Sequence, residues 1–166
     1  PSADDSHRPE RAEPAVKRVL IFGPEPSDDV LGMGGTIRRL VEQGHDVRVV
    51  YLTSGNLGVP DEEALMATEL VRELAEDRGE PENPGAAFAR KVARQLQEKS
   101  KFASDAEDTR RLKSIIRRGE ARAALRECGV DTSRTKFIDL TFYERGRYRQ
   151  FRPETGDRDA LAALLA

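Results

Sequence analysis

The chain has 166 residues and nearly balanced charge, with 28 Lys+Arg against 30 Asp+Glu. This length fits one domain and is enough to bury a core, and the charge balance gives no reason to expect nucleic acid or an anionic membrane as a partner. No apolar run approaches the roughly 20 residues that span a bilayer. The polar N-terminus lacks the apolar centre of a signal peptide, so we expect a cytoplasmic protein.

Residues 1–16 predict a linker or disordered arm. They contain three Pro and many charges and show no periodic apolar pattern, which is typical of a connection between domains. We therefore expect the ordered domain over residues 17–166, and we expect the chain to be part of a larger protein.

The next segment predicts two strands joined by a helix. The apolar run over residues 19–22 is followed by a Gly-Pro pair, which is typical of a strand buried on both faces. Apolar residues recur at helical spacing over 30–41, and Gly44 follows as the C-cap. A second strand is expected over 47–52. This βαβ unit predicts an α/β, Rossmann-like fold with a parallel sheet.

Three further helices, a strand and a last helix are expected, in chain order, over 61–78, 86–101, 108–128, 137–140 and 157–166. The first of these helices carries an apolar face formed by Leu65, Met66, Leu70, Val71 and Leu74. The single Cys128 cannot form an internal disulfide, and we expect a small buried hydrophobe inside the third helix. Because a parallel sheet rarely has so few strands, the domain is expected to be incomplete at its C-terminus.

The turn after the first strand holds the candidate site, because ligands of open α/β sheets bind at the carboxyl ends of the strands. Ser27, Asp28 and Asp29 have two interpretations. Ser is a good N-cap and acids suit the first turn of a helix, so the three residues could simply begin the helix. With Glu25 they could instead form a cation site. A dinucleotide site is disfavoured, because no G-x-G-x-x-G motif lies here and three carboxylates would repel a pyrophosphate.

Glycines in the helix after this turn point to a close approach. Gly32, Gly34 and Gly35 fall in its first turns, and each Gly costs about 1 kcal/mol relative to Ala inside a helix. We therefore expect a neighbouring strand or a ligand to come close to them.

Three ordered segments resemble the PIG-L/LmbE deacetylase family. The first runs from Phe22 to Ile37 and continues to Thr53-Ser-Gly55. It is similar to the family's strand, Pro-His-Pro-Asp-Asp-Glu/Asp turn, Gly-Gly-Thr helix and second strand ending in Thr-x-Gly. The others are residues 117–130, like the Arg-x-x-Glu helix, and residues 137–146. The last segment and the helical insertion look most like the deacetylase-like domain fused behind glucosamine-6-phosphate deaminases.

This resemblance implies zinc-assisted hydrolysis of the amide of an N-acetylglucosamine-type sugar. In the family, two His and one Asp hold zinc, and a neighbouring Asp acts as general base. Carried over to this sequence, the first His falls on Glu25, the general base on Ser27, the ligand Asp on Asp28 and the closing acid on Asp29.

The resemblance also implies a substrate side, with Arg117 and Glu120 facing an amino sugar or sugar phosphate together with Asp29. Arg117 and Arg118 have a second interpretation, a solvated basic stripe near other arginines of the helix, Arg110, Arg111 and Arg122. Tyr143, Glu144 and Arg147 are further candidates for the strand-end face.

The turn departs from the family motif at both catalytic positions. Glu25 replaces a His ligand, which favours harder cations over zinc, and Ser27 cannot act as a general base at neutral pH without an activating partner. No His follows His45, which we expect on the surface rather than at a metal.

Three hypotheses remain. In the first, the chain is the N-terminal fragment of an active zinc deacetylase. In the second, it has lost catalysis and serves as an accessory domain, either beside a fused deaminase domain or in a homo-oligomer. In the third, its turn binds another divalent cation through Glu25, Asp28 and Asp29. The residues at positions 25 and 27 favour the second.

Overall fold

The computed structural model describes residues 15–140 and 154–165. Most of the expected arm, and Tyr143, Glu144 and Arg147, lie outside the described residues. The chain divides into two compact units. We call residues 1–52 with 120–138 the α/β unit, and residues 53–119 with 139–166 the helical unit. The expectation of one ordered domain over 17–166 stays a prediction.

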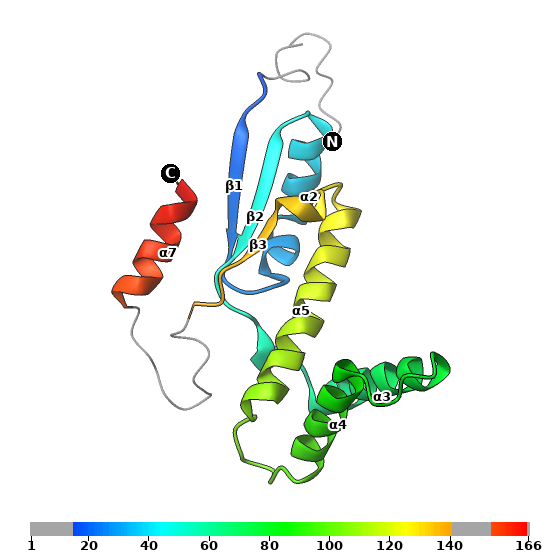
Figure 1. Ribbon diagram of the computed structural model, residues 1–166. Coiled ribbons are helices and arrows are strands. Elements are labelled where there is room, and N and C mark those ends of the chain that lie inside the picture. Colours follow the sequence, from blue (N-terminus) through cyan, green and yellow to red (C-terminus); the bar gives the residue numbers. More distant parts are fainter. Residues whose placement is uncertain (1–14, 141–153, 166) are drawn as a thin grey trace. The chain divides into compact units, whose positions relative to one another are not determined.

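The α/β unit is built on a parallel sheet with strand order β1-β2-β3 (Figure 1). The strands are β1 (Arg18–Gly23), β2 (Asp46–Tyr51) and β3 (Thr135–Phe137), and helix α2 (Asp28–Glu42) connects the first two. A short 3-10 turn, η3 (Thr132–Arg134), precedes β3. The α/β class and the predicted strand–helix–strand order are confirmed.

Apolar side chains from the sheet and from two helices form the core of this unit. Ile37 of α2, Tyr51 of β2 and Leu125 of α5 (Glu107–Glu127) are fully buried in it. Burial of β1 on both faces is wrong, because Phe22 remains 41% exposed while Ile21 is buried. The reason is the alternation of side chains along a strand, here at the edge of the three described strands.

Helix α2 ends as expected at a glycine. Gly44 has a φ of 76°, and its N–H donates to the carbonyl of Val41 while that of His45 donates to the carbonyl of Leu40. This left-handed ending satisfies carbonyls of the last turn. The expectation of a surface His45 is wrong, because the side chain is buried and its Nδ1 accepts a hydrogen bond from the N–H of Lys17 at 3.2 Å.

Strand β3 begins and ends earlier than the apolar run 137–140 suggested. It pairs with β2 over Thr135–Phe137, and the N–H of Ile138 still donates to the carbonyl of Tyr51. Asp139 then turns the backbone into the left-handed region with a φ of 52°. Hydrogen bonding to β2, rather than the apolar run in the sequence, therefore determines where β3 begins and ends.

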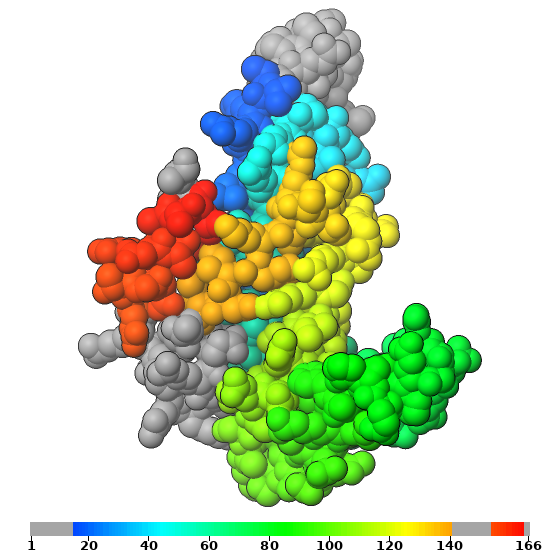
Figure 2. All heavy atoms as spheres, in the orientation of Figure 1, coloured from blue at the N-terminus to red at the C-terminus, as the bar shows by residue number. Residues whose placement is uncertain are grey.

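The helical unit contains α3 (Asp61–Asp77), α4 (Pro84–Gln97), the first part of α5 and α7 (Thr155–Leu165), with a short 3-10 turn, η2 (Asn56–Gly58). Helix α4 starts at a Pro in the first position, with the Asn83 side chain accepting from the N–H of Ala86. It ends at Gln97, earlier than predicted, and α5 ends before Gly129 as predicted. In Figure 2 the side chains of α3 and α4 form one continuous surface (green).

The apolar face of α3 is only partly buried, with Leu65 packed against the apolar cluster of this unit. Met66, Leu70 and Leu74 are each more than half exposed, and the buried side chains are small ones, Ala64, Thr68 and Ala75. Ala64 shares an apolar cluster with side chains of α4 and α5, namely Val92, Leu96 and Leu112. Small residues permit the close packing of α4, which the apolar pattern of α3 alone does not reveal.

Candidate functional site

The candidate site is the turn between β1 and α2, and a close approach of two strand ends fixes where it begins. Gly23 pairs in register with Tyr51, the last residue of β2. A Cβ at Gly23 would lie 2.9 Å from Cδ1 of Tyr51, so this position requires glycine. Pro26, inside the turn, is fully buried.

Ser27 precedes α2 but does not cap it with its side chain. Its backbone is left-handed, with a φ of 95°, and its hydroxyl makes no capping hydrogen bond. Its carbonyl accepts the first helical hydrogen bond, from Leu31. The left-handed conformation costs a residue with a Cβ about 1–2 kcal/mol. The expectation of a capping Ser27 hydroxyl is therefore wrong, although the position is the N-cap.

Two hydrogen bonds between Asp28 and Glu25 close the turn. Oδ2 of Asp28 accepts a hydrogen bond from the N–H of Glu25 at 3.2 Å, and the N–H of Asp28 donates to the carbonyl of Glu25 at 3.2 Å. Asp28 is exposed and Glu25 is half-buried. The carboxylate of Asp28 therefore helps to hold the turn.

Asp29 is tied to the core by Tyr51. Its side chain is buried, and Oδ2 accepts a hydrogen bond from the Tyr51 hydroxyl at 2.8 Å. The ring of Tyr51 stacks on Phe137, with centroids 5.1 Å apart. Burial, and then the hydrogen bond to Asp29, raise the pKa of Tyr51 well above its ordinary value. Sequence reasoning missed Tyr51, although the last residue of β2 must lie at the same sheet edge as the turn.

Asp29 also affects the single thiol of the chain. Cys128 is buried, and burial followed by the charge of Asp29 raises its pKa. A thiol with a raised pKa is a poor nucleophile. The prediction of a small buried hydrophobe is confirmed, although Cys128 lies one residue beyond the end of α5.

The glycines of α2 do not accommodate a neighbouring strand. A Cβ at Gly32 or Gly35 would meet nothing within 4 Å, and one at Gly34 would meet only Val30 of the same helix. The expectation that a strand approaches them is wrong. Their use in ligand binding stays a prediction.

Arg117 and Arg118 of α5 are engaged within the helical unit. Arg117 donates from Nε to the carbonyl of Gly55 at 3.4 Å and from Nη2 to that of Gly58 at 3.3 Å. Arg118 pairs with Asp139. Neither is merely part of a solvated stripe, because each side chain fixes a loop.

The structure thus brings together Glu25, Ser27, Asp28 and Asp29 in one turn of the α/β unit. Glu120, the other predicted substrate residue, is exposed on the part of α5 that belongs to the same unit. Arg117 belongs to the helical unit.

A parallel sheet with an acidic turn at the end of its first strand defines an α/β domain with a polar strand-end loop. The model of the PIG-L family, described as GlcNAc-PI de-N-acetylase, matches residues 20–165. The chain therefore belongs to the PIG-L family.

Two curated relatives are similar to the chain. A glucosamine-6-phosphate deaminase-like protein of Bacteroides thetaiotaomicron is 42% identical over 99% of this chain and 25% of its own length. A diacetylchitobiose deacetylase of Thermococcus kodakarensis is 40% identical over 38% of this chain and 24% of its own length. The chain spans about a quarter of the length of these relatives. No solved structure matches the chain.

PIG-L proteins are in general metal-dependent, so the ligands of the turn can be compared with what zinc requires. Within residues 15–140 and 154–165, no three His, Cys, Asp or Glu side chains gather closely enough to hold a metal ion. Asp28 already bonds the backbone of Glu25, and Asp29 already bonds Tyr51. The described donors do not fit the three protein ligands of a catalytic zinc site.

None of the helices in the described parts of the chain has the length and apolar character needed to cross a bilayer.

Proposed function

We propose that this chain is a PIG-L domain that has kept the family fold and lost metal-dependent amide hydrolysis, and that it serves as an accessory domain of a glucosamine-6-phosphate deaminase-like protein. One observation carries this proposal. The turn presents Glu25 where the family has a His ligand, and Ser27 where it has the general-base Asp.

The chemistry of Ser27 supports the loss of catalysis. A general base must be able to take a proton near neutral pH, and an unassisted hydroxyl cannot. No imidazole stands beside it to activate it, because the single His among the described residues, His45, is buried and accepts its hydrogen bond from Lys17.

The remaining acids of the turn support the same conclusion. Asp28 and Asp29 each already accept a hydrogen bond from the protein, one from the turn and one from the core. Among the described residues these acids are not joined by further His, Cys, Asp or Glu side chains into a group that could hold a metal ion. We therefore assign them to maintaining the strand-end turn rather than to chemistry.

The accessory role rests on the similarity to the Bacteroides protein, which extends over nearly the whole chain. As an accessory domain, the chain would associate with a deaminase domain or with another copy of itself, and its ligand would be an amino sugar or sugar phosphate. Nucleic acid and membranes are not expected partners, and we assign the domain to the cytoplasm.

A second candidate is the N-terminal part of an active zinc-dependent sugar amide hydrolase. The observation in its favour is the similarity to the diacetylchitobiose deacetylase over 63 residues. Asp28 also keeps the position of the ligand Asp. In this case Glu25 would ligate zinc or another divalent cation.

Zinc calorimetry on the full-length protein that contains this chain, beside its Glu25→His, Ser27→Asp variant, separates the two candidates. We expect no tight zinc binding by the unmodified protein, and binding at least about tenfold tighter by the double variant. Glu42→His is the matched control, because it adds an imidazole to an exposed site on α2. Tight binding of zinc, manganese or magnesium by the unmodified protein would revive the hydrolase, and a deacetylase assay on N-acetylglucosamine compounds should then follow.

A further inference from the structure

The helical unit contains a pocket of about 420 Å³ that none of the predicted site residues lines. This volume falls within the range of small-molecule sites. The pocket is formed by η2, the first turn of α3, the segment 99–105 and α5. Its lining has four basic and three acidic side chains, namely Lys99, Lys101, Arg110 and Lys113 against Asp61, Glu62 and Asp105.

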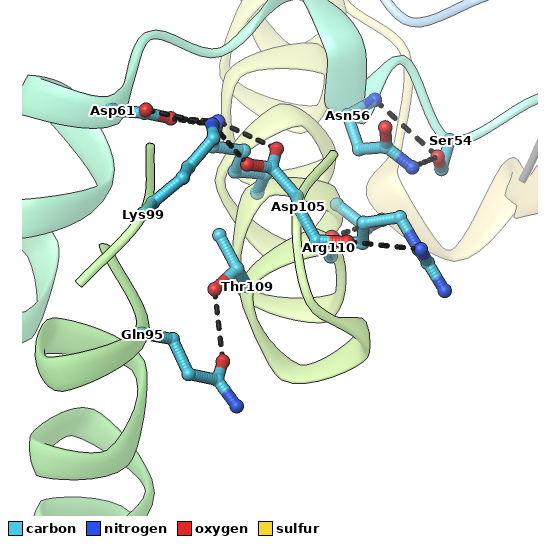
Figure 3. A network of polar contacts seen from close by, with 10 residues as sticks. Ser54, Asn56, Asp61, Gln95, Lys99, Asp105, Thr109 and Arg110 are labelled. Atoms are coloured by element: carbon cyan, nitrogen blue, oxygen red, sulfur yellow. Dashed lines mark hydrogen bonds and ion pairs between the residues drawn. The ribbon is translucent and has the colours of Figure 1, made fainter. Parts of the chain in front are cut away.

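Four of these charges form a closed network. Nζ of Lys99 lies 2.8 Å from Asp61 and 2.5 Å from Asp105, and Nζ of Lys113 lies 2.5 Å and 2.8 Å from the same two carboxylates. In Figure 3 both carboxylates turn toward the Lys99 ammonium. The side chains of Lys113 and Asp105 are only 4% and 8% exposed.

This network is neutral and its carboxylates are satisfied. Burial alone would raise the pKa of Asp61, but hydrogen bonds from Lys113 and Lys99 hold it below its ordinary value. Burial likewise opposes the charge of Lys99, but its bonds to Asp105 and Asp61 raise its pKa. Each carboxylate already contacts two ammonium groups, so the network offers little to an incoming cation.

Two further cations of the lining are not balanced in this way. Nη1 of Arg110 donates to the backbone carbonyl of Asp105 at 3.1 Å (Figure 3), and Nζ of Lys101 lies 6.0 Å from the ring centre of Phe102. Within the part of the chain that the structure describes, neither forms an ion pair with a carboxylate. The remaining acid of the lining, Glu62, is exposed.

We propose that this pocket binds a small anion of the phosphate monoester class, contacted by Arg110 and Lys101 beside the network. A guanidinium has five N–H donors in a planar fork that matches phosphate oxygens. The carbonyl of Asp105 uses one donor and orients the group. An amine ligand would meet the two satisfied carboxylates of the network and only the exposed Glu62 besides, and a neutral polyol would leave both cations unpaired. The proposal does not depend on the proposed function, because it uses neither the turn nor a metal.

Calorimetric titration of the whole chain with inorganic phosphate, glycerol 3-phosphate and glycerol tests the proposal. We expect both phosphates to bind, with affinities that weaken as salt is added, and glycerol not to bind. Equal binding of glycerol and glycerol 3-phosphate, or no phosphate binding by folded chain at millimolar concentration, would overturn it.

Charge variants locate the site. Arg110→Gln and Lys101→Gln should each weaken phosphate binding roughly tenfold, the loss expected for a charge-assisted hydrogen bond. Glu62→Gln should tighten it about twofold by removing a nearby negative charge. Arg111→Gln is the matched control, because Arg111 is the next residue of α5, exposed and outside the lining.

The variants also separate phosphate binding in the pocket from a general attraction to the positive charge of α5. An equal loss in Arg111→Gln would assign the binding to the overall charge of the helix and overturn the site. Lys101 and Glu62 are exposed, so their variants test the proposal even if Arg110→Gln alters the fold. Circular dichroism of each variant establishes that it is folded.

Discussion

The α/β unit and the helical unit use buried polar groups in different ways. The α/β unit has a core of strand and helix side chains, and its buried carboxylate at the family motif, Asp29, is bonded by a neutral hydroxyl of the core. The helical unit has a smaller apolar cluster, and a buried network of two lysines and two aspartates adds to it. The first unit therefore depends mainly on packing, and the second also on ion pairing.

The family motif and the two cations of the pocket lining, Arg110 and Lys101, therefore lie in different units. The turn with the motif belongs to the α/β unit, where Asp28 and Asp29 already serve the fold. The pocket with two cations that lack a described carboxylate partner belongs to the helical unit, and its lining lies outside the three segments that resemble the family.

The largest expected effect is in the buried network. Lys113→Met leaves Asp61 and Asp105 with one ammonium, and breaking a buried ion pair costs about 3–5 kcal/mol. We expect a loss of this size in the free energy of unfolding, measured by urea denaturation. The control is Lys91→Met, which removes an ion pair of a lysine that is 63% exposed and should cost less than about 1 kcal/mol. If Lys113→Met lowered the free energy of unfolding no more than Lys91→Met does, the network would not stabilise the helical unit as proposed.

A smaller loss is expected at the polar contact of the α/β unit. Tyr51→Phe keeps the ring that stacks on Phe137 but removes the donor to Asp29, and an unsatisfied buried acceptor costs about 1–3 kcal/mol. The free energy of unfolding should fall by this amount. Combining Tyr51→Phe with Asp29→Leu, which removes the unsatisfied acceptor, should cost less than the sum of the two single changes. Strict additivity would mean that the two side chains are not coupled.

Changes of pH should affect Asp61 of the helical unit and Tyr51 of the α/β unit at opposite ends of the scale. The folded pKa of Asp61 is depressed, so its contribution is present above its ordinary value of 3.8 and is lost as the pH falls through the folded value. The folded pKa of Tyr51 is raised, so its contribution is present below its ordinary value of 10.0 and is lost as the pH rises above it.

Denaturation midpoints measured across pH test this contrast. Asp61→Asn should flatten the acid limb and Tyr51→Phe the alkaline limb. The raised pKa values of Cys128 and Lys99 add to the alkaline limb above their ordinary values of 9.0 and 10.5, so the comparison of variants is needed. If neither variant changed its limb, the acid limb would not depend on Asp61 and the alkaline limb would not depend on Tyr51.

The smallest effect is expected at a glycine of α2. Gly32→Ala places a methyl group where nothing lies within 4 Å, and Ala is favoured over Gly inside a helix by about 0.5–1 kcal/mol. The thermal midpoint should rise slightly. A fall would indicate a close neighbour at Gly32, in conflict with the open space around it.

The sequence by itself determined the first three elements of the α/β unit. Apolar runs and helical spacing predicted β1, α2 and β2, and Gly44 marked the helix end, because these signals depend on local backbone preferences. The motif residues Glu25 to Asp29 also identified the family without any structure. The strand-end turn was predicted because parallel strands place their carboxyl ends at one edge.

Tertiary structure alone decided which side chains meet. The apolar face of α3 is exposed at Met66 and Leu70 because α4 packs on the small residues. The buried His45 side chain accepts a hydrogen bond from the backbone of Lys17, twenty-eight residues earlier. The network joins Asp61 with Lys113, which is fifty-two residues later. Contacts of this kind depend on how distant segments pack, and single-sequence periodicity carries no information about that packing.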